Sequence, residues 1–197
     1  MKKIFYLFAG VNGAGKSTLY NLAMINQNIK NTIRINTDEI VREIGDWKNN
    51  SDQLKAAKMA INLRNECFLY GKSFNEETTL TGKTILKTID KAKELGYELQ
   101  LFYVGLNSPE IAKERIKNRV KKGGHNIEND IVEKRYYESL KNLKKIILKF
   151  DKVQLYDNSN KYIEFFSFED NKILFKTKDI SWAKEAIEII ENNIKNK

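Results

Sequence analysis

Segments with strand and helix patterns alternate along the chain. The pattern predicts strands over 3–9, 32–36, 73–77, 97–105 and 152–156, with the longest apolar runs in the first and fourth. Apolar residues spaced three and four positions apart predict helices over about 16–25, 51–70, 82–95, 108–122 and 128–149. Strands that alternate with helices are typical of a parallel sheet with right-handed crossovers.

The end of the chain has a different pattern. Residues 162–178 predict a β-hairpin that turns at Asp170 and Asn171, and Ser181 can cap a terminal helix. We therefore expect one α/β domain over 1–197. Its core, 3–160, should hold a five-stranded parallel sheet flanked by helices, with a helical insertion at 108–150 and a hairpin plus helix over 161–197.

A phosphate-binding motif follows the first predicted strand. Residues 10–17 match G-x-x-x-x-G-K-[ST] between a strand and a helix, which is the setting of a P-loop. Glycines let backbone N–H groups turn toward phosphate oxygens, Lys16 should reach the β- and γ-phosphates, and the Ser17 hydroxyl should ligate Mg²⁺. We predict ATP or GTP binding by Gly10, Asn12, Gly13, Ala14, Gly15, Lys16, Ser17 and Thr18.

Several missing motifs narrow the class of nucleotide-binding protein. No N-K-x-D sequence, which reads guanine, occurs in the chain. No strand ends in the four apolar residues plus aspartate of a conventional Walker B motif, because the candidate Asp157 comes too late. A chain of 197 residues also leaves little room for the partner domains of a motor ATPase. These observations favour a small-molecule kinase with ATP and Mg²⁺ as cofactors.

A carboxylate follows the second predicted strand. Asp38 lies where a strand end can face the γ-phosphate, so it can accept the proton of an attacking hydroxyl or help to hold Mg²⁺. The alternative is a helix cap for the segment that begins at Glu39.

Three of the six arginines lie in the predicted insertion. Arg115 and Arg119 are four residues apart on one helix face, and Arg135 belongs to the next helix. Guanidinium groups stabilise the charge of a transferring phosphoryl group, although a solvated helix face would show the same spacing. His125 follows two glycines in a loop, where a lone histidine is more often a surface residue than a catalyst.

Composition adds little to these motifs. The net charge of +9 comes from 29 Lys and 6 Arg, a lysine excess that indicates solvated faces more than a nucleic-acid surface. The single Cys67 excludes a disulfide framework. The first apolar run stops at Gly10, so we expect a cytoplasmic protein with no membrane partner.

Taken together, the motifs resemble the zeta toxin family of P-loop kinases over about residues 3–160. The resemblance is carried by AGVNGAGKST, INTDEI, FNEETTLTGK and VGLNSPEIAKERIKNRVKKGGHNIENDIVEKRYYESLKNL. It implies a fold like adenylate or shikimate kinase and ATP-dependent phosphorylation of a sugar hydroxyl. In this family the acceptor is a UDP-N-acetylamino sugar, and an antitoxin protein blocks ATP binding.

The resemblance also implies roles for single residues. Lys16 is similar to the family's P-loop lysine and Asp38 to its catalytic base. Glu77 and Thr79 match an E-x-T segment that contacts the acceptor, and Arg115 and Arg119 resemble lid arginines. We add Arg135 to the predicted substrate contacts because it comes from the same insertion.

Two other functions remain open at this point. A polynucleotide or nucleoside 5′-hydroxyl kinase would use the same P-loop and would give the basic surface a role. A non-catalytic ATP-binding partner protein would bind ATP without transfer to an acceptor.

Overall fold

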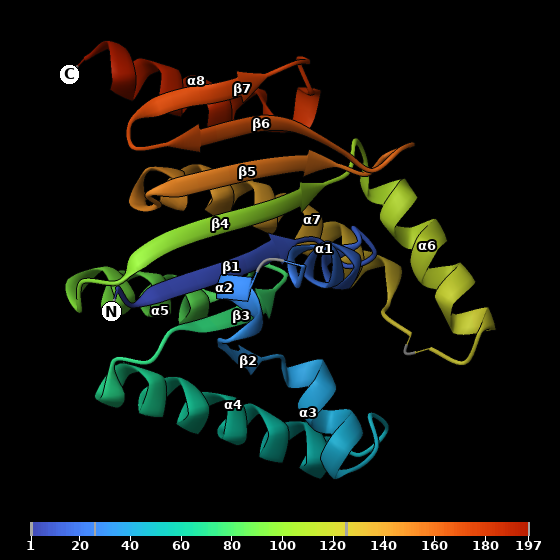
Figure 1. Ribbon diagram of the computed structural model, residues 1–197. Helices are drawn as coiled ribbons and strands as arrows, with labels where there is room; N and C mark the ends of the chain where they lie inside the picture. Colours follow the sequence, from blue (N-terminus) through green and yellow to red (C-terminus); the bar gives the residue numbers. More distant parts are fainter. Residues whose placement is uncertain (1, 26, 125, 197) are drawn as a thin grey trace.

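The computed structural model describes residues 2–25, 27–124 and 126–196. Its centre is a seven-stranded sheet in the order β2-β3-β1-β4-β5-β6-β7 (Figure 1). The strands are β1 (Ile4–Gly10), β2 (Ile33–Ile35), β3 (Phe74–Thr78), β4 (Glu98–Gly105), β5 (Lys152–Asp157), β6 (Ile163–Glu169) and β7 (Lys172–Lys176). The first five strands pair in parallel, and β6 and β7 pair antiparallel.

Helices cover both faces of this sheet. They are α1 (Lys16–Ala23), α2 (Gln27–Lys30), α3 (Thr37–Ile44), α4 (Asn50–Tyr70), α5 (Lys83–Glu94), α6 (Pro109–Lys121), α7 (Asn129–Ile146) and α8 (Lys184–Lys195), with short 3₁₀ turns η1 (Ile147–Lys149) and η2 (Ser181–Ala183). One apolar core lies under α4, α5 and α8, and the other lies under α1, α2 and α6. Because α7 contributes to both cores, it joins the two layers.

The α/β fold with a five-stranded parallel core is confirmed, and two local expectations need correction. The C-terminal hairpin is part of the main sheet, because β6 pairs with β5. The terminal helix α8 begins at Lys184 with Ala183 as its N-cap, so Ser181 lies in η2 and does not cap this helix. The cap of α4 is Asn49, whose side chain accepts a hydrogen bond from the amide of Ser51. No helix among the described residues is long and apolar enough to cross a membrane.

The strand order places the P-loop in the middle of the carboxyl edge of the sheet. β1 lies between β3 and β4, and the loop after it begins at Gly10. A Cβ built on Gly10 would lie 2.2 Å from the carbonyl oxygen of Val104 on β4, and the φ of Gly10 is 144°. Only glycine allows this approach, so the first motif glycine is required by the packing of β1 against β4.

Candidate active site

The loop between β1 and α1 turns through glycines in the left-handed conformation. Gly13 and Gly15 have φ angles of 75° and 100°, which other residues rarely adopt. Gly15 immediately precedes α1 and provides no capping side chain, so no cap side chain competes for the amides of the first helical turn. These N–H groups and the helix dipole form a site for an anion such as phosphate.

Lys16 is held over this loop. Its Nζ donates a hydrogen bond to the carbonyl of Val11 at 3.2 Å. Burial lowers the pKa of Lys16, whereas the carboxylates of Glu77 and Asp38 act in the opposite direction. The ammonium group therefore lies within electrostatic reach of both carboxylates.

Asp38 belongs to the first turn of α3, directly after β2. The side chain of Asn36 caps this helix and accepts hydrogen bonds from the amides of Asp38 at 2.9 Å and of Glu39 at 3.4 Å. The cap is therefore Asn36, and the alternative reading of Asp38 as a helix cap is wrong. Burial raises the pKa of the Asp38 carboxyl above its ordinary value, and the nearby charge of Lys16 partly opposes this.

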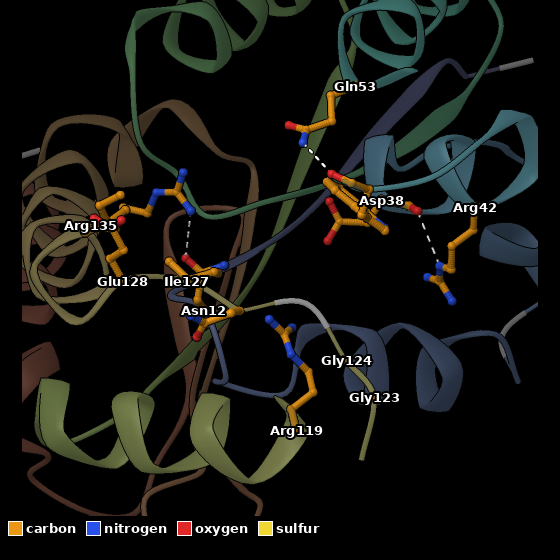
Figure 2. A pocket seen from close by; sticks show the side chains of 13 residues that line it. Asn12, Asp38, Arg42, Gln53, Arg119, Gly123, Gly124, Ile127, Glu128 and Arg135 are labelled. Carbon is orange, nitrogen blue, oxygen red and sulfur yellow. Dashed lines mark hydrogen bonds between the residues drawn. The ribbon is translucent and has the colours of Figure 1, made fainter. Parts of the chain in front are cut away.

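A cavity of 820 Å³ opens beside Asp38. Figure 2 shows Asp38 and Arg42 on one side of it and Arg119 and Arg135 on the other. We call the first side the strand-end wall, which consists of Asn12, Asp38, Arg42, Trp47 and Gln53. The second side, the helical wall, comes from α6, α7 and their connection and consists of Arg119, Gly123, Gly124, Asn126, Ile127, Glu128, Ile131 and Arg135.

Three residues of the strand-end wall, Arg42, Trp47 and Gln53, were not predicted from the sequence. Arg42 donates from Nε to the carbonyl of Asp38 at 3.3 Å, and Gln53 donates from Nε2 to the carbonyl of Trp47 at 2.6 Å (Figure 2). All three lie in α3, in the start of α4 or in their connection. The sequence feature that could have indicated them is their closeness to Asp38 along the chain.

The three predicted arginines occupy different places. Arg119 lines the cavity, and Arg135 lines it too while its Nη1 donates to Oδ1 of Asn12 at 3.3 Å (Figure 2). Arg115 is not among the lining residues, because its guanidinium donates to the carbonyls of Asn158 at 2.6 Å and of Gly13 at 3.4 Å. The prediction for His125 lies outside the described residues.

Asn158 connects Arg115 to the P-loop. Its Nδ2 donates to the carbonyl of Ala14 at 2.8 Å, while its own carbonyl accepts from Arg115. Thus one residue after β5 ties the phosphate loop to α6. Nothing in the sequence pattern singled out this asparagine, because the contact joins positions far apart in the chain.

The two acceptor contacts implied by the resemblance have different hydrogen-bond partners. The carboxylate of Glu77 accepts from Ser17 Oγ at 3.1 and 3.3 Å. The hydroxyl of Thr79 bonds to that of Thr81 at 2.8 Å. Neither Glu77 nor Thr79 is among the described residues that line the cavity.

A Mg²⁺ ion is expected beside Ser17. Within residues 2–25, 27–124 and 126–196, no group of three or more His, Cys, Asp or Glu side chains could hold a metal ion. Mg²⁺ at such sites retains water and is bound by one or two carboxylates together with substrate phosphates. The Ser17 hydroxyl and the nearby carboxylate of Glu77 are oxygen donors of this type, so the residues fit the ion.

Comparison with known proteins identifies the family of the chain. The chain is 39% identical over 135 residues to an uncharacterized protein of Haemophilus influenzae, and the match covers 68% of this chain and 92% of that protein. A structure of the PezAT toxin–antitoxin system of Streptococcus pneumoniae superposes with a TM-score of 0.60 at 20% identity, covering 100% of this chain and 88% of that one.

A second solved structure extends the likeness of the fold. The AvrRxo1-ORF1:-ORF2 complex with ATP has a TM-score of 0.67 at 14% identity, covering 96% of this chain and 64% of that one. The family model described as "Zeta toxin" matches residues 1–167, most of the chain. The chain therefore belongs to the zeta toxin family of P-loop kinases.

Proposed function

We propose that the protein transfers the γ-phosphate of ATP to a hydroxyl of a nucleotide sugar, such as a UDP-N-acetylamino sugar. The observation that supports this best is the cavity that joins Asp38 on one wall to Arg119 and Arg135 on the other, next to the P-loop. A volume of 820 Å³ lies within the range of small-molecule sites, about 300–1,000 Å³.

The P-loop would hold the phosphates of ATP. The amides of the first turn of α1 would bind phosphate oxygens, and Lys16 would contact the β- and γ-phosphates. Ser17 would hold Mg²⁺, which when bound neutralises charge on the β- and γ-phosphate oxygens.

Asp38 would accept the proton of the acceptor hydroxyl. Its raised pKa brings the carboxylate closer in basicity to a working general base, and its place on the cavity wall gives it access to the acceptor. Arg119 and Arg135 would stabilise the charge on the transferring phosphoryl group. Arg115 would act on the same reaction through its hydrogen bonds to the P-loop and to Asn158.

The strand-end wall would bind the acceptor. Arg42 offers a cation, Trp47 an aromatic ring and Gln53 an amide within one cavity, groups that suit an anionic molecule with rings. This composition agrees with the nucleotide sugar that the family resemblance implies. The contacts of Glu77 and Thr79 with the acceptor stay predictions.

The partner and the compartment are parts of the same proposal. The PezAT structure is described as a toxin–antitoxin system, and we propose that this chain too has an antitoxin partner. We place the reaction in the cytoplasm, where ATP is available, with no nucleic acid or membrane partner.

The decisive experiment is incubation with labelled ATP and Mg²⁺ in the presence of UDP-sugars, nucleosides and oligonucleotides, with mass spectrometry of the products. We expect a UDP-sugar that is heavier by one phosphate. Label on an oligonucleotide, with an apparent affinity that falls steeply with salt, would instead identify a polynucleotide kinase. ATP binding with no labelled product in any of the mixtures would support the non-catalytic partner protein.

A further inference from the structure

The carboxylate of Glu77 faces the P-loop from the neighbouring strand. In the register of β1 and β3, Glu77 lies opposite Phe8, whose side chain packs in the core under α1. Paired residues on adjacent strands point to the same face of a sheet. Glu77 therefore points toward α1, while its neighbour Glu76 points to the other face and pairs with Arg64 of α4.

The contact with Ser17 matches the chemistry of a magnesium site. The hydroxyl of Ser17 donates its one hydrogen to the carboxylate of Glu77. A serine hydroxyl has one donor hydrogen and two acceptor lone pairs, so this donation leaves the lone pairs of Ser17 available for a cation. In P-loop enzymes the loop serine or threonine and one nearby acid hold Mg²⁺ together.

A second set of contacts fixes Glu77 in this position. Arg34 Nη2 donates to the carboxylate at 2.8 Å, and Asn36 Nδ2 donates to it at 3.2 Å. Arg34 is itself held by two hydrogen bonds to Glu39 and lies 3.5 Å from the ring centre of Tyr20. With only 11% of its side chain exposed, Glu77 is a pre-positioned carboxylate rather than a surface charge.

We infer that Glu77 is the acidic residue of the Mg²⁺ site, where it orients the Ser17 hydroxyl and supplies negative charge to the ion. This assignment differs from the contact with the acceptor that the family resemblance implies. It rests on the proposed function because Mg·ATP is the ligand. It also explains the missing Walker B pattern, since the strand FNEET carries the acid without an apolar run before it.

The test measures metal binding apart from catalysis. The affinity of the protein for ATP is determined by titration calorimetry in Mg²⁺ and again in EDTA, without any acceptor. For Glu77→Gln we expect ATP binding in EDTA to stay within about threefold of the unaltered protein, whereas the gain in affinity from Mg²⁺ should fall by about 10- to 100-fold, as for other residues that support a metal ligand.

Two variants keep the result interpretable. Thr79 is two residues away from Glu77, and Thr79→Val should keep the full gain in ATP affinity from Mg²⁺. Ser17→Ala should lose that gain as Glu77→Gln does, and the double variant should lose no more than either alone, because both act through one ion. If Glu77→Gln is less stable, Ser17→Ala still tests the metal site, because it leaves Arg34 and Glu77 paired.

The outcomes separate the inference from the proposed function. If Glu77→Gln keeps the gain from Mg²⁺ and raises only the KM for the acceptor, Glu77 contacts the acceptor and the inference is wrong. If the unaltered protein binds ATP equally well in Mg²⁺ and EDTA, the inference fails while the kinase assignment can stand. A protein that transfers phosphate to none of the acceptors but shows the expected metal effects would contradict the proposed function alone.

Discussion

The two walls of the cavity are built differently. On the strand-end wall, Asp38 follows β2 directly, and the Asn36 cap fixes the turn of α3 that carries it. On the helical wall, Arg119 and Arg135 extend from two separate helices, and Arg135 reaches the P-loop through a long hydrogen bond of 3.3 Å. Sheet topology thus places Asp38 and the phosphate loop, whereas helix packing places the two arginines opposite them.

If the strand-end wall carries the chemistry, removing its base should have the largest effect. Asp38→Asn should lower kcat by about 100- to 10,000-fold, the usual contribution of a general base. ATP affinity should change little, because Asp38 is not part of the P-loop. Single-turnover phosphotransfer and ATP titration on the same preparation would check this, and a normal kcat would remove Asp38 from the role of base.

The second prediction separates binding from chemistry at the P-loop, next to the strand-end wall. Lys16→Ala removes a charged contact to phosphate, so kcat should fall by about 100- to 1,000-fold. Unlike Asp38→Asn, it should also weaken ATP binding by about 10- to 100-fold, since hydrogen bonds from charged groups contribute about 1.5–3 kcal/mol. Unchanged ATP affinity would contradict the position of Lys16 over the loop.

The helical wall is tested by two arginines on the same face of α6. Arg119→Ala should lower kcat by about 100-fold if its cation meets the transferring phosphoryl group. Arg115→Ala should lower kcat less than Arg119→Ala and should lower the free energy of unfolding by about 1–3 kcal/mol, because the carbonyls of Gly13 and Asn158 lose their donor. Equal losses of kcat in the two variants, with equal stability, would contradict the different roles of Arg119 and Arg115.

A pH profile gives a smaller effect. Since burial raises the pKa of Asp38, kcat/KM should begin to fall at a higher pH than for an ordinary aspartate, by about tenfold per unit below that pKa. The folded protein binds this proton more tightly than the unfolded chain, so ionised Asp38 lowers stability at neutral pH. Asp38→Asn should therefore show an equal or higher Tm at pH 7 than the unaltered protein, and a lower Tm would be inconsistent with the buried carboxylate.

The smallest effect on catalysis is expected far from both walls. Trp182 donates from Nε1 to the carboxylate of Asp157 at 3.0 Å and packs against Gly105. Trp182→Phe should reduce the free energy of unfolding by about 1–3 kcal/mol through the loss of a hydrogen bond to a buried charged group, with kcat within about twofold. Denaturant unfolding and steady-state kinetics would test this, and a large loss of kcat would extend the site to η2.

The parallel strands and the P-loop could be predicted from the sequence. The five parallel strands are confirmed, and the segments with Lys16 and Asp38 follow β1 and β2 at one edge of the sheet because the carboxyl ends of parallel strands share an edge. The P-loop motif is local, so its backbone shape could be expected from seven or eight residues.

Contacts between distant segments could not be predicted. Arg115 and Arg119 have the same spacing pattern, and only the tertiary position of Asn158 separates their roles. The burial of β3 could not be predicted either, because its polar side chains Asn75 and Glu76 are paired with Arg34 and Arg64 from distant segments. The family resemblance indicated Glu77 as a site residue. The face of the sheet to which its side chain points depends on the register of β3 with β1, which the sequence does not give.

Two lysines of the lysine-rich chain lie on the antiparallel edge strand of the sheet. β7 forms one edge of the sheet, where Leu174 is 60% and Phe175 is 41% exposed. An apolar edge strand with free backbone groups invites pairing with another chain, and lysines on such strands oppose it. Lys172 and Lys176 stand at the two ends of β7, where Lys176 also pairs with Glu191. Edge-to-edge aggregation between copies of the protein would bring the lysines of two strands together.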